Sequence, residues 1–262
     1  MAVDEALFES LGIPGAIPVL RIYGWQPPGV SVGYFQSLEK GINLDAIHER
    51  GYGLVRRPTG GRAIIHHHEV TYSVCTRADY LADGNSVLKS YREISTGIEA
   101  GLALLDIGAH VPRGHGGPAV KGKDLPSVCF AKALGGDMTV QGRKIVGSAQ
   151  MRRAGCILQH GSIPITIDLD EHVSILGEPD ANEQDARQAL ASCAVGVADV
   201  VGRPVSFDEL AQCIASGFER AMGTTLEPGD LTPLEKQRAA ELAQSKYGDE
   251  QWTMTPGRRD RR

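Results

Sequence analysis

Residues 142–150 read GRKIVGSAQ, which places Lys144 among small and apolar residues. We expect a strand over residues 143–152. Burying a lysine in such a strand is unfavourable unless an opposite charge pairs with it, and buried lysines are therefore often functional. The alternative is that the aliphatic part of the side chain follows the surface and the ammonium reaches water. The segment alone does not separate these two interpretations.

The residues on both sides of this segment predict further strands. They cover residues 137–141 and 156–167, and Gln141-Gly142 and Ala154-Gly155 are suited to hairpin turns between the strands. Upstream, residues 109–127 are rich in Gly, Pro and Lys and indicate a mobile loop. The chain is thus expected to form consecutive hairpins directly after a long loop.

The rest of the chain combines short strands with helices, and its last third is helical. The expected helices cover residues 3–11, 42–49 and about 86–108, and the expected strands cover residues 19–25, 30–35 and 70–76, the last of them half-buried. Residues 206–209 and 232–235 read as capping boxes, and Gly223 and Gly248 fit as helix ends. This order of elements indicates an α+β domain with mixed sheets.

A second candidate site lies at residues 56–66, RRPTGGRAIIH. The paired glycines Gly60 and Gly61 let a ligand approach the backbone closely, and the flanking Arg57 and Arg62 can hold a carboxylate or phosphate. The alternative is a tight connection between strands with arginines on the surface. A glycine pair by itself is weak evidence for either interpretation.

The run His66-His67-His68-Glu69 resembles a metal-binding sequence only superficially. Neighbouring side chains of a strand point to opposite faces, so consecutive histidines do not easily bind one ion. The chain has no second His or Cys cluster with ligand spacing. We therefore expect no metal and place His66 in a structural or substrate-lining position.

Cys129 is the third candidate, because it follows the long loop and precedes Lys144 by fifteen residues. A thiol needs a nearby cation to become a good nucleophile at neutral pH, and a strand lysine facing a loop cysteine would supply it. The other four cysteines have apolar neighbours and are expected to be small core residues: Cys75, Cys156, Cys193 and Cys213.

The overall composition is that of a globular protein without extreme features. A length of 262 residues with 42% hydrophobic residues suits one domain, or one domain with a small appendage. A net charge of −5 gives no bias toward nucleic acid or a membrane surface. The N-terminal sequence is not a signal peptide and no run of about 18 apolar residues occurs, so we expect no membrane span.

Cysteine usage and charge distribution refine this picture. The cysteines are odd in number and form no C-x-x-C pair, which fits a reducing cytosol, so we expect a cytoplasmic protein. Residues 121–153 carry a net charge of +5, whereas residues 168–185 hold seven acids and no Lys or Arg. These are either ordinary solvated faces or, at residues 121–153, a basic rim that receives an acidic partner protein.

Taken together, these segments resemble the lipoate-protein ligase A / biotin ligase catalytic-domain family. The resemblance covers residues 3–7, Trp25 with Pro27-Pro28, residues 56–66, 69–74, 142–150 and 158–163, and Lys246-Tyr247 with Trp252. It implies an α+β catalytic domain, with mixed sheets flanked by helices, over residues 1–225. Residues 226–262 would form a short helical extension and a basic tail.

Within that family, residues 127–130 and 147–150 are similar to the octanoyltransferase branch that uses a loop cysteine. The resemblance implies that Cys129 carries the acyl thioester and that Lys144 lowers the pKa of its thiol. The residues that match the family's acyl-pocket and substrate-binding positions are Arg57, Gly60, Gly61, Arg62, His66, Gly147, Ser148, Ala149 and His160.

The same resemblance implies the substrates. Octanoyl would pass from acyl carrier protein to the lysine of a lipoyl domain, in a glycine-cleavage H protein or a dehydrogenase subunit, without a cofactor, and we expect a monomer. Three alternatives remain open. They are an ATP-dependent lipoate or octanoate ligase, an amidotransferase that moves octanoyl between lipoyl domains, and a binding module without turnover. The presence of both Cys129 and Lys144 argues against the last.

Overall fold

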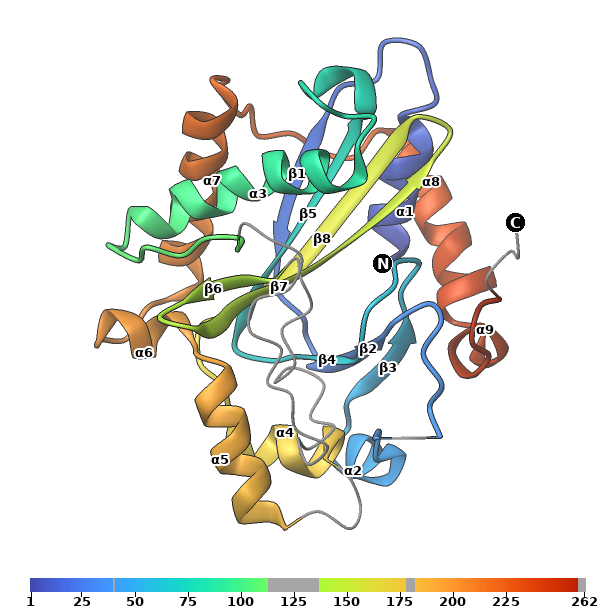
Figure 1. Cartoon of the computed structure of the whole chain (residues 1–262). Coiled ribbons are helices and arrows are strands. Elements are labelled where there is room, and N and C mark those ends of the chain that lie inside the picture. The colour runs from blue at the N-terminus through green and yellow to red at the C-terminus, as the bar shows by residue number, and fades with distance from the viewer. Residues whose placement is uncertain (40, 113–136, 178–181, 259–262) are drawn as a thin grey trace.

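The computed structural model describes residues 1–39, 41–112, 137–177 and 182–258, and two sheets form its frame (Figure 1). The larger sheet has the order β1-β5-β8-β7-β6, with β1 Val19–Tyr23, β5 Glu69–Arg77, β8 Cys156–Pro164, β7 Arg143–Arg153 and β6 Met138–Val140. All its neighbouring strands are antiparallel. The smaller sheet has the order β3-β2-β4, with β3 Gly53–Arg56, β2 Gly29–Val32 and β4 Ile64–His66. In it β2 runs parallel to β3 and antiparallel to β4, so the expected mixed sheet is confirmed.

Helices cover both faces of the larger sheet. The helices are α1 Ala2–Ser10, α2 Leu44–Glu49, α3 Val87–Ala103, α4 Leu169–Leu176, α5 Glu183–Cys193, α6 Val197–Val201, α7 Phe207–Met222, α8 Pro233–Leu242 and α9 Glu250–Met254, with short turns η1 Ala78–Tyr80 and η2 Ala243–Tyr247. Helices α3 and α7 lie on one face of the sheet and α1 with α8 on the other, while α2 and α4 pack on the smaller sheet (Figure 1). The predicted α+β class is confirmed. None of the described helices is both long and apolar enough to cross a membrane.

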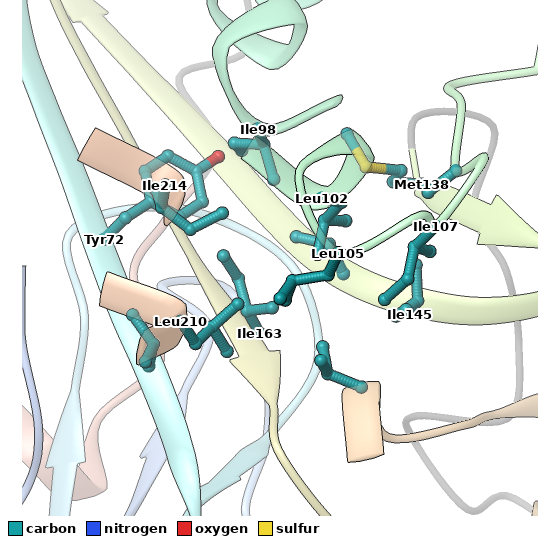
Figure 2. Close-up of a cluster of buried hydrophobic side chains, with 14 of the residues drawn as sticks. Tyr72, Ile98, Leu102, Leu105, Ile107, Met138, Ile145, Ile163, Leu210 and Ile214 are labelled. Carbon is teal, nitrogen blue, oxygen red and sulfur yellow. The ribbon is translucent and has the colours of Figure 1, made fainter. Parts of the chain in front are cut away.

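The main core lies between the larger sheet and the helices α3 and α7. Figure 2 shows its members from three sources: the sheet, α3 with the turn after it, and α7. They include Tyr72, Ile145 and Ile163, then Ile98, Leu102, Leu105 and Ile107, then Leu210 and Ile214. Each buried side chain of this size contributes about 1.5–3 kcal/mol relative to exposure, so this layer fixes the sheet against the helices.

Strand β5 corrects one expectation. It was expected to be half-buried, but eight of its nine residues are buried. The reason is α1, whose Leu7 and Phe8 pack on Cys75 and cover the second face. A polar residue on that face is satisfied internally, since Ser73 Oγ donates to Asp4 Oδ1 at 2.8 Å.

The predicted caps were correct at one helix and half correct at another. Thr232 and Glu235 form the expected reciprocal capping box of α8. At α7 the Ser206 side chain accepts from the Glu209 backbone N–H, but the Glu209 carboxylate pairs with Arg203 at 2.6 Å, so that box is incomplete. Gly223 ends α7 in the left-handed conformation, as expected.

The C-terminal segment is fastened to the rest of the chain by buried polar contacts. Lys246 Nζ lies 2.7 Å from the buried Glu5 carboxylate, and Tyr247 donates its hydroxyl proton to the same group. Arg56, fully buried, donates to the carbonyl oxygens of Thr253 at 3.0 Å and Gly33 at 2.6 Å. Residues 246–253 therefore link α1 to the smaller sheet through these contacts.

Candidate active site

A pocket lies where the two sheets meet. Its empty volume is about 610 Å³, counted out to its open mouth. Nine of the residues singled out in the sequence line it: Arg57, Gly61, Arg62, His66, Lys144, Gly147, Ser148, Ala149 and His160. Gly60 lies beside it, since its carbonyl oxygen accepts two bonds from Arg57. Cys129 lies outside the described residues.

The β6–β7 hairpin positions Lys144. Gln141 and Gly142 have φ values of 50° and 79°, the pair of left-handed residues that a two-residue hairpin turn requires, so this predicted turn is confirmed. The register shifts between Met138 and Thr139, which leaves Asp137 at the strand start beside Lys144. Lys144 Nζ lies 3.1 Å from Asp137 Oδ1, and the two side chains are only 9% and 8% exposed.

This ion pair excludes the second interpretation, in which the Lys144 ammonium reaches water. The ammonium does not reach water along the surface, and a carboxylate balances its charge within the pocket wall. Sequence reasoning did not single out Asp137. Its spacing gave no signal, because the register of this hairpin places Thr139, not Asp137, opposite Lys144.

The glycine segment is shaped by Arg57. Its guanidinium is buried and donates to the carbonyl oxygens of Ser31 at 3.1 Å, Gly60 at 2.9 Å and Arg62 at 2.7 Å. Gly61 has a φ of 101°, and a Cβ there would meet Arg57 Nη2 at 2.6 Å, so the turn requires glycine. The backbone of this segment therefore forms the tight connection between strands that was the alternative interpretation. The arginine part of that alternative is wrong for Arg57, because its side chain is buried.

A buried polar network surrounds His66. Its ring stacks on Trp25 with centroids 4.1 Å apart, its Nδ1 lies 2.7 Å from Glu69 Oε1, and its Nε2 lies 2.7 Å from Ser31 Oγ. Thr71 and Ser162 also donate to the Glu69 carboxylate. Four of these residues line the pocket, namely Ser31, His66, Thr71 and Ser162. Sequence reasoning named His66 and Glu69 but missed the hydroxyl residues, of which Thr71 is close in the chain whereas Ser31 and Ser162 are distant.

His160 lines the pocket as a buried, neutral imidazole. Its Nε2 lies 2.6 Å from Thr59 Oγ1, and its Nδ1 has no hydrogen-bond partner among the described residues. Burial lowers its pKa to about 3, and the nearby Asp4 carboxylate offsets this only in part. The ring therefore holds no charge at neutral pH.

His67 and His68 point away from this arrangement. His67 Nδ1 lies 2.9 Å from Glu171 Oε1 and 3.1 Å from the Tyr52 hydroxyl, and neither histidine lines the pocket. Burial, with help from Glu171, raises the pKa of Tyr52 to about 12. Within the described ranges, no three His, Cys, Asp or Glu side chains gather as a metal ion would need.

The remaining predictions concern the four other cysteines, expected in the core, and the basic residues 121–153, expected at the surface. Cys75 and Cys156 are buried in the core beneath α1, as expected, whereas Cys193 and Cys213 are only partly buried. Of the basic stretch, residues 121–132 lie outside the described residues. Arg153 lies 3.6 Å from Glu9 with 59% of its side chain exposed, so it is available at the surface.

Comparisons with known proteins identify the class. Residues 1–219 match the family described as the lipoyl protein ligase A/B catalytic domain, and this chain belongs to that family. The chain is 44% identical over 256 residues to octanoyltransferase LipM of Symbiobacterium thermophilum, which covers 97% of this chain and 93% of the relative. It is 37% identical over 255 residues to octanoyltransferase LipM of Bacillus subtilis, with 96% and 92% covered.

Solved structures agree with this assignment. A crystal structure of lipoate-protein ligase A bound with ATP has a TM-score of 0.78 and 27% identity, covering 97% of this chain and 92% of that one. The bipartite lipoate protein ligase of Thermoplasma acidophilum, studied with its E2 lipoyl domain, has a TM-score of 0.79 and 26% identity, covering 100% and 92%. The fold is that of the lipoate ligases.

Proposed function

We propose that this protein transfers octanoyl from octanoyl-acyl carrier protein to the lysine of a lipoyl domain, through a thioester on Cys129. That the chain is an acyltransferase follows from relatives named octanoyltransferase that align with nearly its whole length. A lipoyl domain as acceptor is supported by the structural relative that was studied with its E2 lipoyl domain.

The observation that carries the covalent mechanism is the buried cation at the pocket. Lys144 and Asp137 both line the pocket, and Cys129 precedes Asp137 by only eight residues. Eight residues span at most about 26–29 Å, which is an upper limit on the distance between Cys129 and Asp137. A fixed ammonium stabilises a nearby thiolate, which is the nucleophilic form of cysteine.

The reaction would then run in two steps. In the first, the Cys129 thiolate attacks the donor thioester, its sulfur–carbonyl bond forms, and the carrier's thiolate leaves. Both compounds are thioesters, so this step is nearly isoenergetic and needs no ATP. In the second, the acceptor amine attacks the acyl-enzyme, and the more stable amide drives the transfer.

The test is an intact-mass measurement in the absence of nucleotide. Incubation with octanoyl-acyl carrier protein should give an octanoyl adduct that hydroxylamine removes and that maps to the peptide containing Cys129. Cys129→Ala should form no adduct and transfer no octanoyl, whereas Cys193→Ala, a partly exposed cysteine elsewhere, should behave as wild type. Full activity of Cys129→Ala would refute the thioester mechanism.

A ligase is the second candidate, because the chain resembles a lipoate-protein ligase solved with ATP. The same assay separates the two activities. Product from free octanoate and ATP alone would favour the ligase, and product from an octanoylated lipoyl domain alone would favour the amidotransferase.

Docking of acidic carrier domains is proposed for the basic residues 121–153. Charge reversal of Lys121, Lys123 and Arg153 should raise KM for the carrier and flatten its dependence on salt, with little change in kcat. Unchanged salt dependence would count against this surface. Truncation before Arg258 tests the C-terminal basic tail separately.

A further inference from the structure

Ser148 differs from the other hydroxyl side chains that line the pocket. Among the described residues these hydroxyls are those of Ser31, Thr71, Ser148 and Ser162. Thr71 and Ser162 donate to the Glu69 carboxylate, and Ser31 Oγ lies 2.7 Å from His66 Nε2. Ser148 instead accepts a hydrogen bond, because the Tyr72 hydroxyl donates to its Oγ at 2.8 Å.

The direction of this Tyr72–Ser148 hydrogen bond follows from the side-chain amide of Gln159. Gln159 Nε2 lies 3.5 Å from the backbone carbonyl oxygen of Tyr91, which can only accept, and 3.4 Å from Ser95 Oγ, whose own hydrogen goes to the same carbonyl. The NH₂ group therefore occupies this side of the amide. It also lies 3.2 Å from the Tyr72 oxygen and donates to it. Because an NH₂ group cannot accept, the Tyr72 hydrogen goes to its other partner, Ser148 Oγ.

This network is buried and connects the larger sheet to α3. Tyr72 on β5, Gln159 on β8 and Ser95 on α3 are all buried. The Gln159 carbonyl oxygen accepts from Gln150 Nε2 at 3.0 Å, so both ends of this amide are satisfied. Burial raises the pKa of Tyr72 to about 12, so its hydroxyl keeps the hydrogen that it donates at neutral pH.

Gly161 gives Ser148 and Tyr72 the room to approach each other. It lies opposite Ser148 across the β7–β8 pair. A Cβ at this position would lie 2.6 Å from Ser148 Oγ and 2.6 Å from a ring carbon of Tyr72. Gly161 and Ser148 both line the pocket, and Ser148 is only partly buried, so its hydroxyl borders the cavity.

The hydrogen of Ser148 is thus left for an acceptor other than Tyr72. One candidate acceptor is the Tyr91 hydroxyl, since burial raises the pKa of Tyr91 and a contact with Ser148 offsets a small part of that rise. The other candidate is a ligand in the pocket. An acyl group offers one strong hydrogen-bond acceptor, its carbonyl oxygen, and the rest of the chain is hydrocarbon.

We propose that Ser148 donates its hydroxyl hydrogen to the carbonyl oxygen of the bound acyl group, with Tyr72 as the positioning residue. The inference rests on the proposed acyl transfer, but neither on the identity of the donor nor on that of the attacking group. When a nucleophile adds to the acyl carbon, an electron pair of the C=O bond moves to the oxygen, and the hydrogen bond from Ser148 stabilises the charge. The pair returns when the leaving group departs with its own electrons, and Ser148 keeps its hydrogen throughout.

The kinetic test compares wild type, Ser148→Ala and Tyr72→Phe, with octanoyl-acyl carrier protein as donor and a lipoyl domain as acceptor. Ser148→Ala should lower kcat by about 10²–10³-fold and leave KM for the donor nearly unchanged, because the hydrogen bond strengthens only as charge develops. Tyr72→Phe keeps the Ser148 hydroxyl but not its alignment, and should lower kcat by about 2–12-fold, the equivalent of one ordinary hydrogen bond. Ser148 is only partly buried, so Ser148→Ala serves if Tyr72→Phe does not fold.

The matched control is Tyr52→Phe. It also removes a tyrosine hydroxyl that donates a hydrogen bond, in this case to Glu171, but Tyr52 does not line the pocket. Its kcat and KM should equal those of wild type.

A binding measurement by calorimetry separates contact with the carbonyl from a structural role and needs no turnover. One probe is an octanoyl-pantetheine analogue in which CH₂ replaces the thioester sulfur, and the second probe has CH₂ in place of the carbonyl as well. The ratio of the two affinities should fall by about 2–12-fold in Ser148→Ala, with binding of the carbonyl-free probe unchanged. Tyr52→Phe should keep the wild-type ratio.

Several results would overturn the inference. A wild-type kcat for Ser148→Ala, or a loss confined to KM, would refute the role at the carbonyl. An affinity ratio that Ser148→Ala does not change would assign the Ser148 hydrogen to Tyr91. Impaired Ser148→Ala together with wild-type kinetics of Tyr72→Phe would refute positioning by Tyr72. If the wild-type protein transferred octanoyl from no donor, the proposed function would fail, and the affinity ratio would still decide whether Ser148 contacts the carbonyl.

Discussion

Replacing Asp137 with asparagine removes the carboxylate that lies 3.1 Å from Lys144 Nζ. At an effective dielectric constant of 20, this separation corresponds to an attraction of about 5 kcal/mol. Removing one partner of a buried pair typically lowers stability by about 3–5 kcal/mol, because the other charge is left uncompensated. Both side chains are more than nine-tenths buried, so we expect a loss in that range and a fall in Tm of about 6–20 °C.

The assay is urea denaturation of four proteins: wild type, Asp137→Asn, Lys144→Met and the double variant. The double variant buries no charge at this place and should recover much of the loss, giving a coupling energy of about 2–3 kcal/mol. Asp83→Asn is the matched control, since Lys89 and Asp83 form a 3.0 Å pair with side chains 61% and 54% exposed. It should cost less than about 1 kcal/mol.

The reasoning is refuted by either of two results. Asp137→Asn could prove no more destabilising than Asp83→Asn, or the two single effects at Asp137 and Lys144 could simply add. Either would mean that the pair is screened by water and does not hold the lysine charged in the pocket wall.

Three further predictions concern the same pocket. Gly61→Ala should lower stability by about 1–3 kcal/mol, because its φ of 101° is strained for alanine and its Cβ meets Arg57; denaturation curves that match wild type would contradict this. The unfolded chain titrates His160 near pH 6.5 and the folded one near pH 3, so the unfolded state binds more protons between these values. Stability should therefore decrease as the pH is lowered through that window, by up to about 1.4 kcal/mol per unit. His160→Asn should reduce the difference in stability that denaturation measures between pH 7 and pH 5; equal differences would argue against a buried neutral ring. In Lys144→Ala the midpoint of Cys129 alkylation by iodoacetamide should move to higher pH as octanoyl loading slows; a fixed midpoint with lost transfer would instead place Lys144 on the substrate.

Local chemistry was sufficient to predict several features of this protein from the sequence. Gln141-Gly142 is a hairpin turn because of the backbone angles these residues tolerate, and the Thr232 cap works through groups three residues apart. Lys144 was recognisable because a charge in an apolar strand conflicts with its neighbours. Each of these signals is carried by residues adjacent in the chain, so no knowledge of the fold is needed to interpret them.

Tertiary structure decided which side chains contact these residues. Asp137 meets Lys144 only because the register shifts within the β6–β7 hairpin, and Ser31 meets His66 across 35 residues because β2 and β4 pair. Strand β5 is buried on both faces because α1 docks on it, which its own pattern does not reveal. The sequence thus singled out the candidate site residues, whereas their pairing and burial depend on how the two sheets and their helices pack, a property of distant segments.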